Sequence, residues 1–281
     1  MKHPIVLAHG VCRFDVFWHN VLASDNNDDP EIDKFHYFKG VRTFLKRHNY
    51  EVWHASVPWG ASVEKRAAAL RKNILGILEG KAKTAKVHII AHSMGGLDTR
   101  HMLSQDRNDG LVYPQIASLT TISTPHAGSP FADWALKHMF EALHLAKAIG
   151  LDLSAVQDLT TTSCCAFNRD PEVQSFEEKL ARSIQFRTYG GHQSWYGTFW
   201  PLKIPHKIIE DQEGRNDGLV SVASAKWHEA FFQKEIPKTD HLNELGWWDH
   251  SQIGEKESPS MLLGRIHELY LEIAREITAG G

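Results

Sequence analysis

The stretch Lys86-Val-His-Ile-Ile-Ala-His-Ser-Met-Gly-Gly96 decides the fold that this sequence predicts. It begins with a largely apolar, β-branched run up to Ala91, which is typical of a buried strand. A tight turn follows over residues 92–96, and residues 97–103 then predict the beginning of a helix. Ser93 is therefore expected in a sharp turn that joins a strand to a helix.

The positions two before and two after Ser93 are small, as such a turn requires. A serine held there adopts a strained backbone, and the strand and helix pass close to each other. Ala91 and Gly95 leave the room for this. Because Ser93 is expected between a strand and a helix, the match to the G-x-S-x-G pattern predicts a nucleophile elbow. The helix that follows also directs free N–H groups and a positive dipole end at the site, which favours an oxyanion there.

Strand and helix signals alternate on both sides of this turn. Strands are expected at 4–8, 50–57, 116–124, 184–190 and 227–236, and helices at 38–49, 62–80 and 261–277. This order predicts an α/β protein whose mostly parallel sheet is covered by helices on both faces. With the elbow, it predicts the α/β-hydrolase fold, and we expect residues 1–281 to form a single domain of this fold.

The strand signal disappears between residues 130 and 182, where apolar residues recur at helical spacing. We interpret this segment as a helical cap or lid inserted into the domain. Its expected apolar face carries Trp134, Met139, Phe140, Leu143 and Leu145. An insertion between strands of such a sheet lies over their carboxyl ends, where the active site is expected. The alternative is an ordinary packed helix pair.

An elbow serine needs an acid and a histidine later in the chain, in that order. Asp217 stands in a turn before the apolar pair Leu219-Val220, and His241 follows the last expected strand. We therefore predict Ser93 as nucleophile, His241 as general base and Asp217 as the acid that orients the histidine. The competing acids are Glu210, Asp211 and Asp240. Asp217 is preferred because the glycine that follows it permits the loop geometry.

The oxyanion needs a second hydrogen-bond donor from another loop, and the turn after the first strand lies in the right place. We assign this role to the backbone N–H groups of Val11 and Met94. Most of the 18 histidines must be structural or solvated. We expect His9, His92 and His126 to shape the site through hydrogen bonds and not to take protons.

Six segments in this order resemble the bacterial true lipases, especially their thermoalkaline branch. They are Pro4-Ile-Val-Leu-Ala-His-Gly10, Phe38-Lys-Gly-Val-Arg42, Val87 to Gly96, Thr121-Ile-Ser-Thr-Pro-His126 with Gly128-Ser129, Asn216-Asp-Gly-Leu-Val220 and Asp240-His-Leu242. They fall within residues 4–129 and 216–242. The resemblance implies carboxylic-ester hydrolysis, a mobile helical lid over an apolar acyl pocket, and the triad predicted above.

The resemblance also raises the question of whether this chain binds zinc or calcium. Thermoalkaline relatives hold a structural zinc partly on an extra segment that this chain lacks, and Lys65 stands near the expected aspartate, so we predict no zinc. Related lipases bind calcium just after the catalytic histidine, where this chain has Asn243 and a displaced Asp249. Calcium prefers about six to eight oxygen ligands. A structural calcium is therefore a doubtful alternative, and no cofactor is expected.

The composition narrows the range of partners. The chain has 31 Lys and Arg against 34 Asp and Glu, a net charge of −3, with no basic run, so nucleic acid is not expected. The mean hydropathy of −0.36 fits a soluble globular protein. No run approaches the roughly 18 apolar residues of a membrane span, and no signal peptide is visible. We expect a cytoplasmic protein, or a secreted one if this is a mature form. Cys12, Cys164 and Cys165 are expected to be free thiols.

The leading hypothesis is a lipase or carboxylesterase that meets a lipid or small ester substrate and makes transient contact with a lipid interface. An acyltransferase or polyester hydrolase would use the same triad. A ligand-binding protein that has lost its chemistry is less favoured because all three triad residues are present. The aromatic cluster Trp195, Tyr196, Phe199 and Trp200 is expected in the core, or with part of it lining the acyl pocket.

Overall fold

The computed structural model describes residues 3–11, 26, 29–82, 84–138, 153–255 and 257–279. Within these residues six strands form one sheet in the order β2-β1-β3-β4-β5-β6, and every neighbouring pair is parallel. The strands are β1 Ile5–Ala8, β2 Val52–His54, β3 Val87–His92, β4 Ile116–Ile122, β5 Gln185–His192 and β6 Phe232–Pro237. The expected parallel α/β architecture is therefore confirmed.

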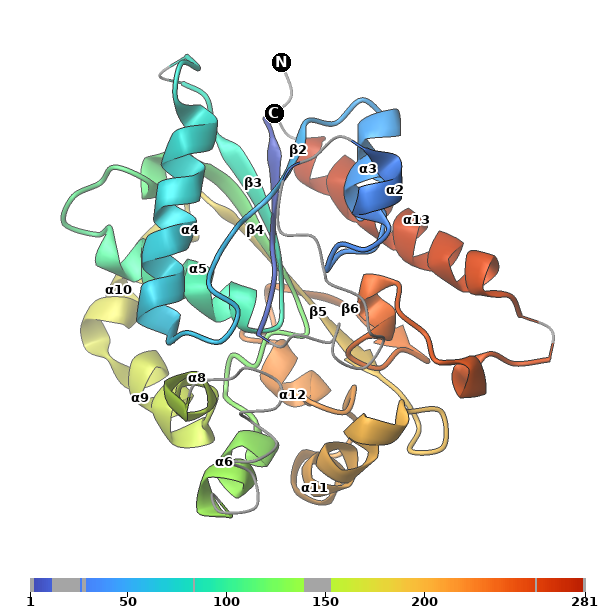
Figure 1. The fold of residues 1–281 in the computed structure, drawn as a ribbon. Coiled ribbons are helices and arrows are strands. Elements are labelled where there is room, and N and C mark those ends of the chain that lie inside the picture. The colour runs from blue at the N-terminus through green and yellow to red at the C-terminus, as the bar shows by residue number, and fades with distance from the viewer. Residues whose placement is uncertain are drawn as a thin grey trace.

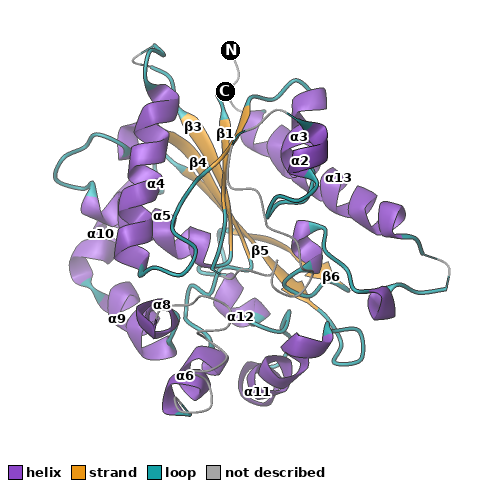
Figure 2. Cartoon of the chain, viewed as in Figure 1, coloured by secondary structure: helices purple, strands orange, loops and turns teal. Residues whose placement is uncertain are grey.

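Helices cover both faces of this sheet (Figure 1). They are α2 Pro30–Asp33, α3 Val41–Arg47, α4 Val63–Leu78, α5 Met94–Gln105, α6 Pro130–Lys137, α8 Leu153–Asp158, α9 Thr161–Arg169, α10 Pro171–Leu180, α11 Lys203–Glu213, α12 Val222–Ala225 and α13 Pro259–Thr278. In Figure 2 the strands run through the middle of the molecule, between the two helical layers. No helix of the described ranges is long and apolar enough to cross a membrane.

The alternation of side chains along β1 separates two hydrophobic cores. Ile5 and Leu7 face one way and pack in a cluster with buried residues of α3 and α13. Val6 and Ala8 face the other way and pack with buried residues of α4, α5 and α10. Because successive strand residues point to opposite faces, a continuous apolar run is what a sheet covered on both sides requires. The burial of these faces is the main source of stability for the sheet that carries the site.

The carboxyl ends of the strands point to the lower end of Figure 1, where α6, α8, α11 and α12 gather. The insertion expected at 130–182 begins there and is helical in its described parts, α6 and α8 to α10. Of the residues expected on its apolar face, Met139, Phe140, Leu143 and Leu145 lie outside the described residues. Arg100 of α5 holds helices α9 and α10 of this segment. It donates to both carboxylate oxygens of Glu177 on α10 at 2.8 and 3.0 Å, and to Asn168 Oδ1 on α9 at 2.8 Å.

Three helices, α2, α11 and α12, were not expected from the sequence. Helix α11 contains Pro205, and a proline usually interrupts a helical pattern. Here it is the third residue of the helix, where the backbone N–H would have no partner within the helix in any case. Helix α5 also begins at Met94, directly after Ser93 and three residues earlier than the apolar pattern indicated.

Candidate active site

Ser93 stands between β3 and α5 with φ 55° and ψ −132°. A positive φ is rare for a residue with a side chain, so the strain expected at this turn is confirmed. The turn also needs its glycines: a Cβ at Gly95 would lie 2.5 Å from the Ala8 carbonyl oxygen, and one at Gly96 would lie 2.2 Å from Thr124 Oγ1. Gly95 and Gly96 are therefore required by the close approach of α5 to β1 and to Thr124, two residues after β4.

The turn is fixed to its neighbours by hydrogen bonds. The Ser93 N–H donates to the Ile122 carbonyl oxygen at 3.0 Å, and Thr124 Oγ1 donates to the Ser93 carbonyl oxygen at 2.7 Å. The turn after β1 lies against the serine, because a Cβ on Gly10 would fall 2.6 Å from Ser93 Cβ and 3.0 Å from its Oγ. Val11, the predicted oxyanion donor, directly follows this contact.

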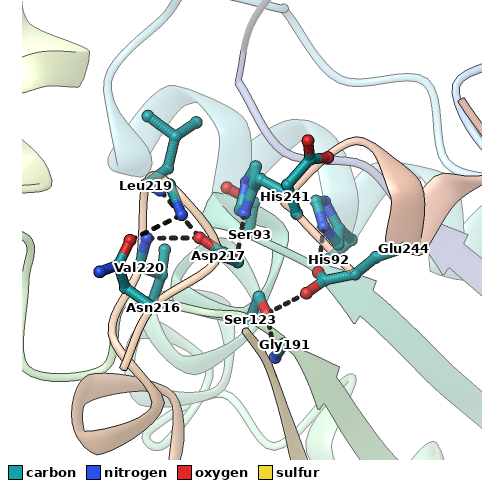
Figure 3. A network of polar contacts seen from close by, with 12 residues as sticks. His92, Ser93, Ser123, Gly191, Asn216, Asp217, Leu219, Val220, His241 and Glu244 are labelled. Atoms are coloured by element: carbon teal, nitrogen blue, oxygen red, sulfur yellow. Dashed lines mark hydrogen bonds and ion pairs between the residues drawn. The ribbon is translucent and has the colours of Figure 1, made fainter. Parts of the chain in front are cut away.

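His241 and Asp217 meet in the structure. His241 Nδ1 lies 2.7 Å from Asp217 Oδ2, and both side chains are buried. The other carboxylate oxygen, Oδ1, accepts from the backbone N–H groups of Leu219 and Val220 at 2.8 and 2.7 Å. The intervening Gly218 has φ 100°, which bears out the reason for preferring this acid. Ser93 belongs to the same cluster of side chains (Figure 3).

The three competing acids have other partners. Asp240 is buried, and its carboxylate accepts from the backbone N–H groups of Leu242, Asn243 and Phe199. Burial raises the pKa of Asp240 to about 6, against the effect of these hydrogen bonds. Glu210 and Asp211 lie on the exposed side of α11 and pair with Lys207 of the same helix. Of the four candidates, the structure brings only Asp217 into hydrogen-bond contact with His241 among the described residues.

A second buried carboxylate lies beside this pair and was missed by the sequence analysis. Glu244 Oε2 lies 3.0 Å from His92 Nε2, and its Oε1 accepts from the Ser123 hydroxyl at 2.7 Å. His92 Nδ1 in turn lies 2.8 Å from the Tyr37 hydroxyl, and the Gly191 N–H donates to Ser123 Oγ at 3.0 Å. This network joins the loop of His241 to β3, to Ser123 directly after β4, and to β5, beside Ser93 (Figure 3).

Burial governs the charge of this second pair. It raises the pKa of Glu244 well above its ordinary value, and the negative charge of Asp217 adds to the effect. Burial also lowers the pKa of His92 well below its ordinary value, with a further contribution from His241. A neutral His92 has one N–H donor and one acceptor, so it can bridge Tyr37 and Glu244 in either tautomer.

The other two histidines expected to shape the site also make hydrogen bonds. His9 Nδ1 donates to the Gly10 carbonyl oxygen at 2.8 Å, and its ring stacks on Trp59. His126 Nε2 lies 3.0 Å from Thr121 Oγ1, and burial lowers its pKa well below the ordinary value. His9 and His126 therefore make side-chain hydrogen bonds, as predicted from the sequence.

The described residues include one group that could hold a metal ion: ligand atoms of His92, His241 and Glu244 lie within 4.8 Å of one another. Each of these side chains is already hydrogen-bonded within one of the two pairs, so the group fits a metal poorly. The residues considered for calcium are also engaged: Asn243 Oδ1 accepts from the Asp240 N–H, and Asp249 Oδ1 accepts from the Ser251 N–H. Neither offers a free set of oxygen ligands.

The aromatic cluster is divided between the core and the surface. Phe199 is buried, but Trp195, Tyr196 and Trp200 are exposed, so a core position is confirmed for Phe199 and wrong for the other three. A place for part of the cluster in the acyl pocket stays a prediction. A groove of about 780 Å³ lies elsewhere, between β2 and α4, and its lining includes Trp53 and Asn73 but none of the predicted triad. This groove is therefore separate from the candidate active site.

The parallel sheet and the serine at a strained strand-to-helix turn define the chain as an α/β hydrolase. A family model described as "PGAP1-like alpha/beta domain" matches residues 44–188. Triacylglycerol lipase 2 of Saccharomyces cerevisiae is 31% identical over 328 residues, which cover 100% of this chain and 92% of that protein. A triacylglycerol lipase of Burkholderia plantarii is 32% identical over 137 residues, 47% of this chain and 32% of that protein.

Solved structures show the same fold. The mature Bacillus licheniformis lipase BlEst2 matches with a TM-score of 0.63 and 19% identity, over 97% of this chain and 92% of that one. The Staphylococcus hyicus lipase matches with a TM-score of 0.61 and 18% identity, over 98% and 96% of the two chains. The chain belongs to the lipase family of α/β-hydrolases with a PGAP1-like domain, and it is a carboxylic ester hydrolase.

Proposed function

We propose that this protein hydrolyses carboxylic esters of lipids through an acyl-enzyme formed on Ser93, with His241 as base and Asp217 as the orienting acid. The observation that carries this proposal is the buried 2.7 Å contact between His241 Nδ1 and Asp217 Oδ2 in the cluster that contains Ser93. With its Nδ1–H donated to the carboxylate, His241 keeps Nε2 as an acceptor for the serine proton.

The reaction then follows from these positions. Ser93 Oγ attacks the ester carbonyl carbon while His241 takes the proton of the Ser93 hydroxyl. The backbone N–H groups of Val11 and Met94 then stabilise the resulting oxyanion. The contact of Gly10 with Ser93 supports this assignment because it brings the turn after β1 to the serine. His241 returns the proton to the leaving alcohol. Water, activated by the same histidine, then releases the fatty acid and frees Ser93.

The substrate class is inferred from the relatives. Two of them are named triacylglycerol lipases, and one of these aligns with the whole chain. A long-chain lipid ester is therefore the substrate that we propose, with transient contact between the protein and a lipid interface. Within a single domain of residues 1–281, the segment 130–182 would act as the cap over the site. Its start at the carboxyl ends of the strands supports this role.

Turnover of p-nitrophenyl esters from acetate to palmitate, and of emulsified triacylglycerol, tests the proposal. Ser93→Ala should reduce kcat to below about a thousandth of the parent value, because removal of the nucleophile leaves only binding and oxyanion stabilisation. Ser175→Ala, at an exposed position on α10, is the matched control and should retain parent activity. A Ser93→Ala variant that keeps more activity would refute the assignment. Product analysis with added glycerol separates hydrolysis from acyl transfer.

A further inference from the structure

Exposed apolar side chains are concentrated in one short segment. Eight large hydrophobic residues are exposed in the described part of the chain, and four of them lie within residues 195–204. They are Trp195 at 41%, Tyr196 at 86%, Trp200 at 67% and Ile204 at 67% exposure. Single exposed apolar residues are common on soluble proteins, but a contiguous group marks an interaction site. We refer to these four residues with Lys203 as the aromatic patch.

The aromatic patch is attached to the loops of the candidate active site. The Phe199 N–H donates to Asp240 Oδ2 at 2.9 Å, next to His241 in the chain. Leu202 packs at the glycine that follows Asp217, since a Cβ on Gly218 would lie 2.9 Å from Leu202 Cβ. Helix α11 also packs against α6, at the carboxyl ends of the strands (Figure 1). A surface that docks through this segment would therefore meet the molecule on the active-site side.

The charge of this segment favours an anionic surface. The segment 195–209 contains Lys203 and Lys207 and no carboxylate, although the chain as a whole has a net charge of −3. Lys207 pairs with Glu210 and Asp211, which follow this segment on α11. Lys203 lies over the Trp195 ring, with Nζ 4.5 Å from the ring centroid, and forms no ion pair with any described residue. One cation is thus held among the exposed aromatic rings and can meet a phosphate group.

We propose that the aromatic patch docks the enzyme on the surface of a phospholipid bilayer that contains anionic lipid. Trp and Tyr rings bury an apolar body while their polar atoms stay at the headgroup level, and Lys203 would pair with lipid phosphate. Trp200, just before α11, and Ile204, four positions later and within it, are both exposed and would enter the acyl region together. This inference rests on the proposed function, because it gives a lipid hydrolase its orientation at the interface.

A second copy of the chain fits the aromatic patch less well. A two-fold self-interface presents the same surface to both copies, and residues 195–209 offer Lys203 no carboxylate to pair with. A cation that loses water without gaining a partner opposes association. A lipid surface offers phosphate groups to this cation and apolar chains to the rings, and it satisfies both.

Sedimentation with vesicles of phosphatidylcholine mixed with phosphatidylglycerol tests this directly. The assay uses Ser93→Ala protein, so lipid is not consumed and the result does not depend on the nucleophile assignment. Adding Trp200→Ser and Ile204→Ser should weaken vesicle binding about tenfold or more, because two large apolar side chains are no longer transferred from water into the bilayer. The matched control is Leu111→Ser, which removes a similarly exposed side chain ahead of β4, at the opposite end of the sheet. It should leave vesicle binding unchanged.

Three results of the vesicle assay would overturn the inference. They are no vesicle binding by the Ser93→Ala protein, equal binding by the Trp200→Ser/Ile204→Ser variant, or an equal loss with Leu111→Ser. A dimer in lipid-free solution that the double variant abolishes would assign the patch to self-association instead. Circular dichroism checks that each variant is folded. Hydrolysis of soluble esters by the parent enzyme tests the proposed function separately, so the two proposals can fail independently.

Discussion

Two buried carboxylate–histidine pairs lie side by side in this protein, and they differ in what surrounds the carboxylate. Asp217 contacts His241 at 2.7 Å, and Glu244 contacts His92 at 3.0 Å. Two backbone N–H groups donate to the second oxygen of Asp217, whereas the second oxygen of Glu244 accepts from a serine hydroxyl. Backbone donors favour the charged form of a carboxylate, and burial without them favours the neutral form.

The comparison shows that residue type and distance do not by themselves define a catalytic pair. Asp217 sits in a loop whose own backbone stabilises a negative charge, which is what a histidine that becomes protonated during the reaction needs. The pKa of Glu244 is raised by burial and by the charge of Asp217, so Glu244 serves best as a neutral hydrogen-bonding group that positions His92. The first pair supports proton transfer, and the second holds the elbow in place.

The substitution Asp217→Asn should have the largest effect on catalysis and should distinguish the two pairs. The amide can donate to His241 Nδ1 and so favours the tautomer that carries its proton on Nε2, where the base must be free. We expect kcat on a soluble ester to fall roughly 10⁴-fold, as for the equivalent change in other triads. Steady-state kinetics with p-nitrophenyl acetate measures this. A loss of less than about tenfold would show that another acid orients His241.

Glu244→Gln should have a much smaller effect on catalysis. Glutamine keeps the size and both hydrogen-bonding functions of a protonated glutamate, so His92 can adopt the matching tautomer. We expect kcat to stay within about tenfold of the parent value. A drop as large as that of Asp217→Asn would mean that Glu244 takes part in the proton transfer.

The same variant should change how stability depends on pH. Because the folded-state pKa of Glu244 lies above its ordinary value of 4.5, the folded protein holds this proton more strongly than the unfolded chain. The stability that this group contributes is therefore complete below pH 4.5 and is lost as the pH rises through the folded-state pKa. Urea unfolding of both proteins from about pH 5 to about pH 8 should show the parent losing stability relative to Glu244→Gln. A stability difference that does not change with pH, or a parent that gains stability relative to Glu244→Gln as the pH rises, would contradict the raised pKa.

Chelation should have the smallest effect. Asn243 and Asp249 are used in local hydrogen bonds, and His92, His241 and Glu244 are used in the two pairs. We expect EDTA to leave ester hydrolysis and Tm unchanged. A loss of either that added calcium restores would reveal a site formed by these or other oxygens.

The sequence predicted those parts of the molecule that repeat a pattern or obey a steric rule. The strands were visible as short apolar runs, and the turn at Ser93 was visible because Ala91 and Gly95 are small. The structure supplies the reason at Gly95, where a Cβ would lie 2.5 Å from the Ala8 carbonyl oxygen. Asp217 could be preferred because Gly218 supplies the positive φ of its loop. These are local requirements, and a single sequence displays them.

The rest depended on contacts between distant segments. Glu244 meets Ser123 across 121 positions of the chain and His92 across 152, and nothing beside it in the sequence marks it as buried. The only available signal was a carboxylate three residues after His241. Whether an aromatic residue such as Trp200 is buried also depends on which elements pack around it, so the sequence could not separate the buried Phe199 from its three exposed neighbours.

Labelling of the active serine by a fluorophosphonate probe tests the central claim that the Asp217–His241 pair, and not the Glu244–His92 pair, activates Ser93. Labelling rates are measured for the parent, Asp217→Asn and Glu244→Gln proteins, and the modified residue is located by mass spectrometry. We predict labelling on Ser93 that is fast in the parent, nearly as fast in Glu244→Gln and strongly slowed in Asp217→Asn. Labelling of another residue, or slowing by Glu244→Gln with little change in Asp217→Asn, would contradict this account.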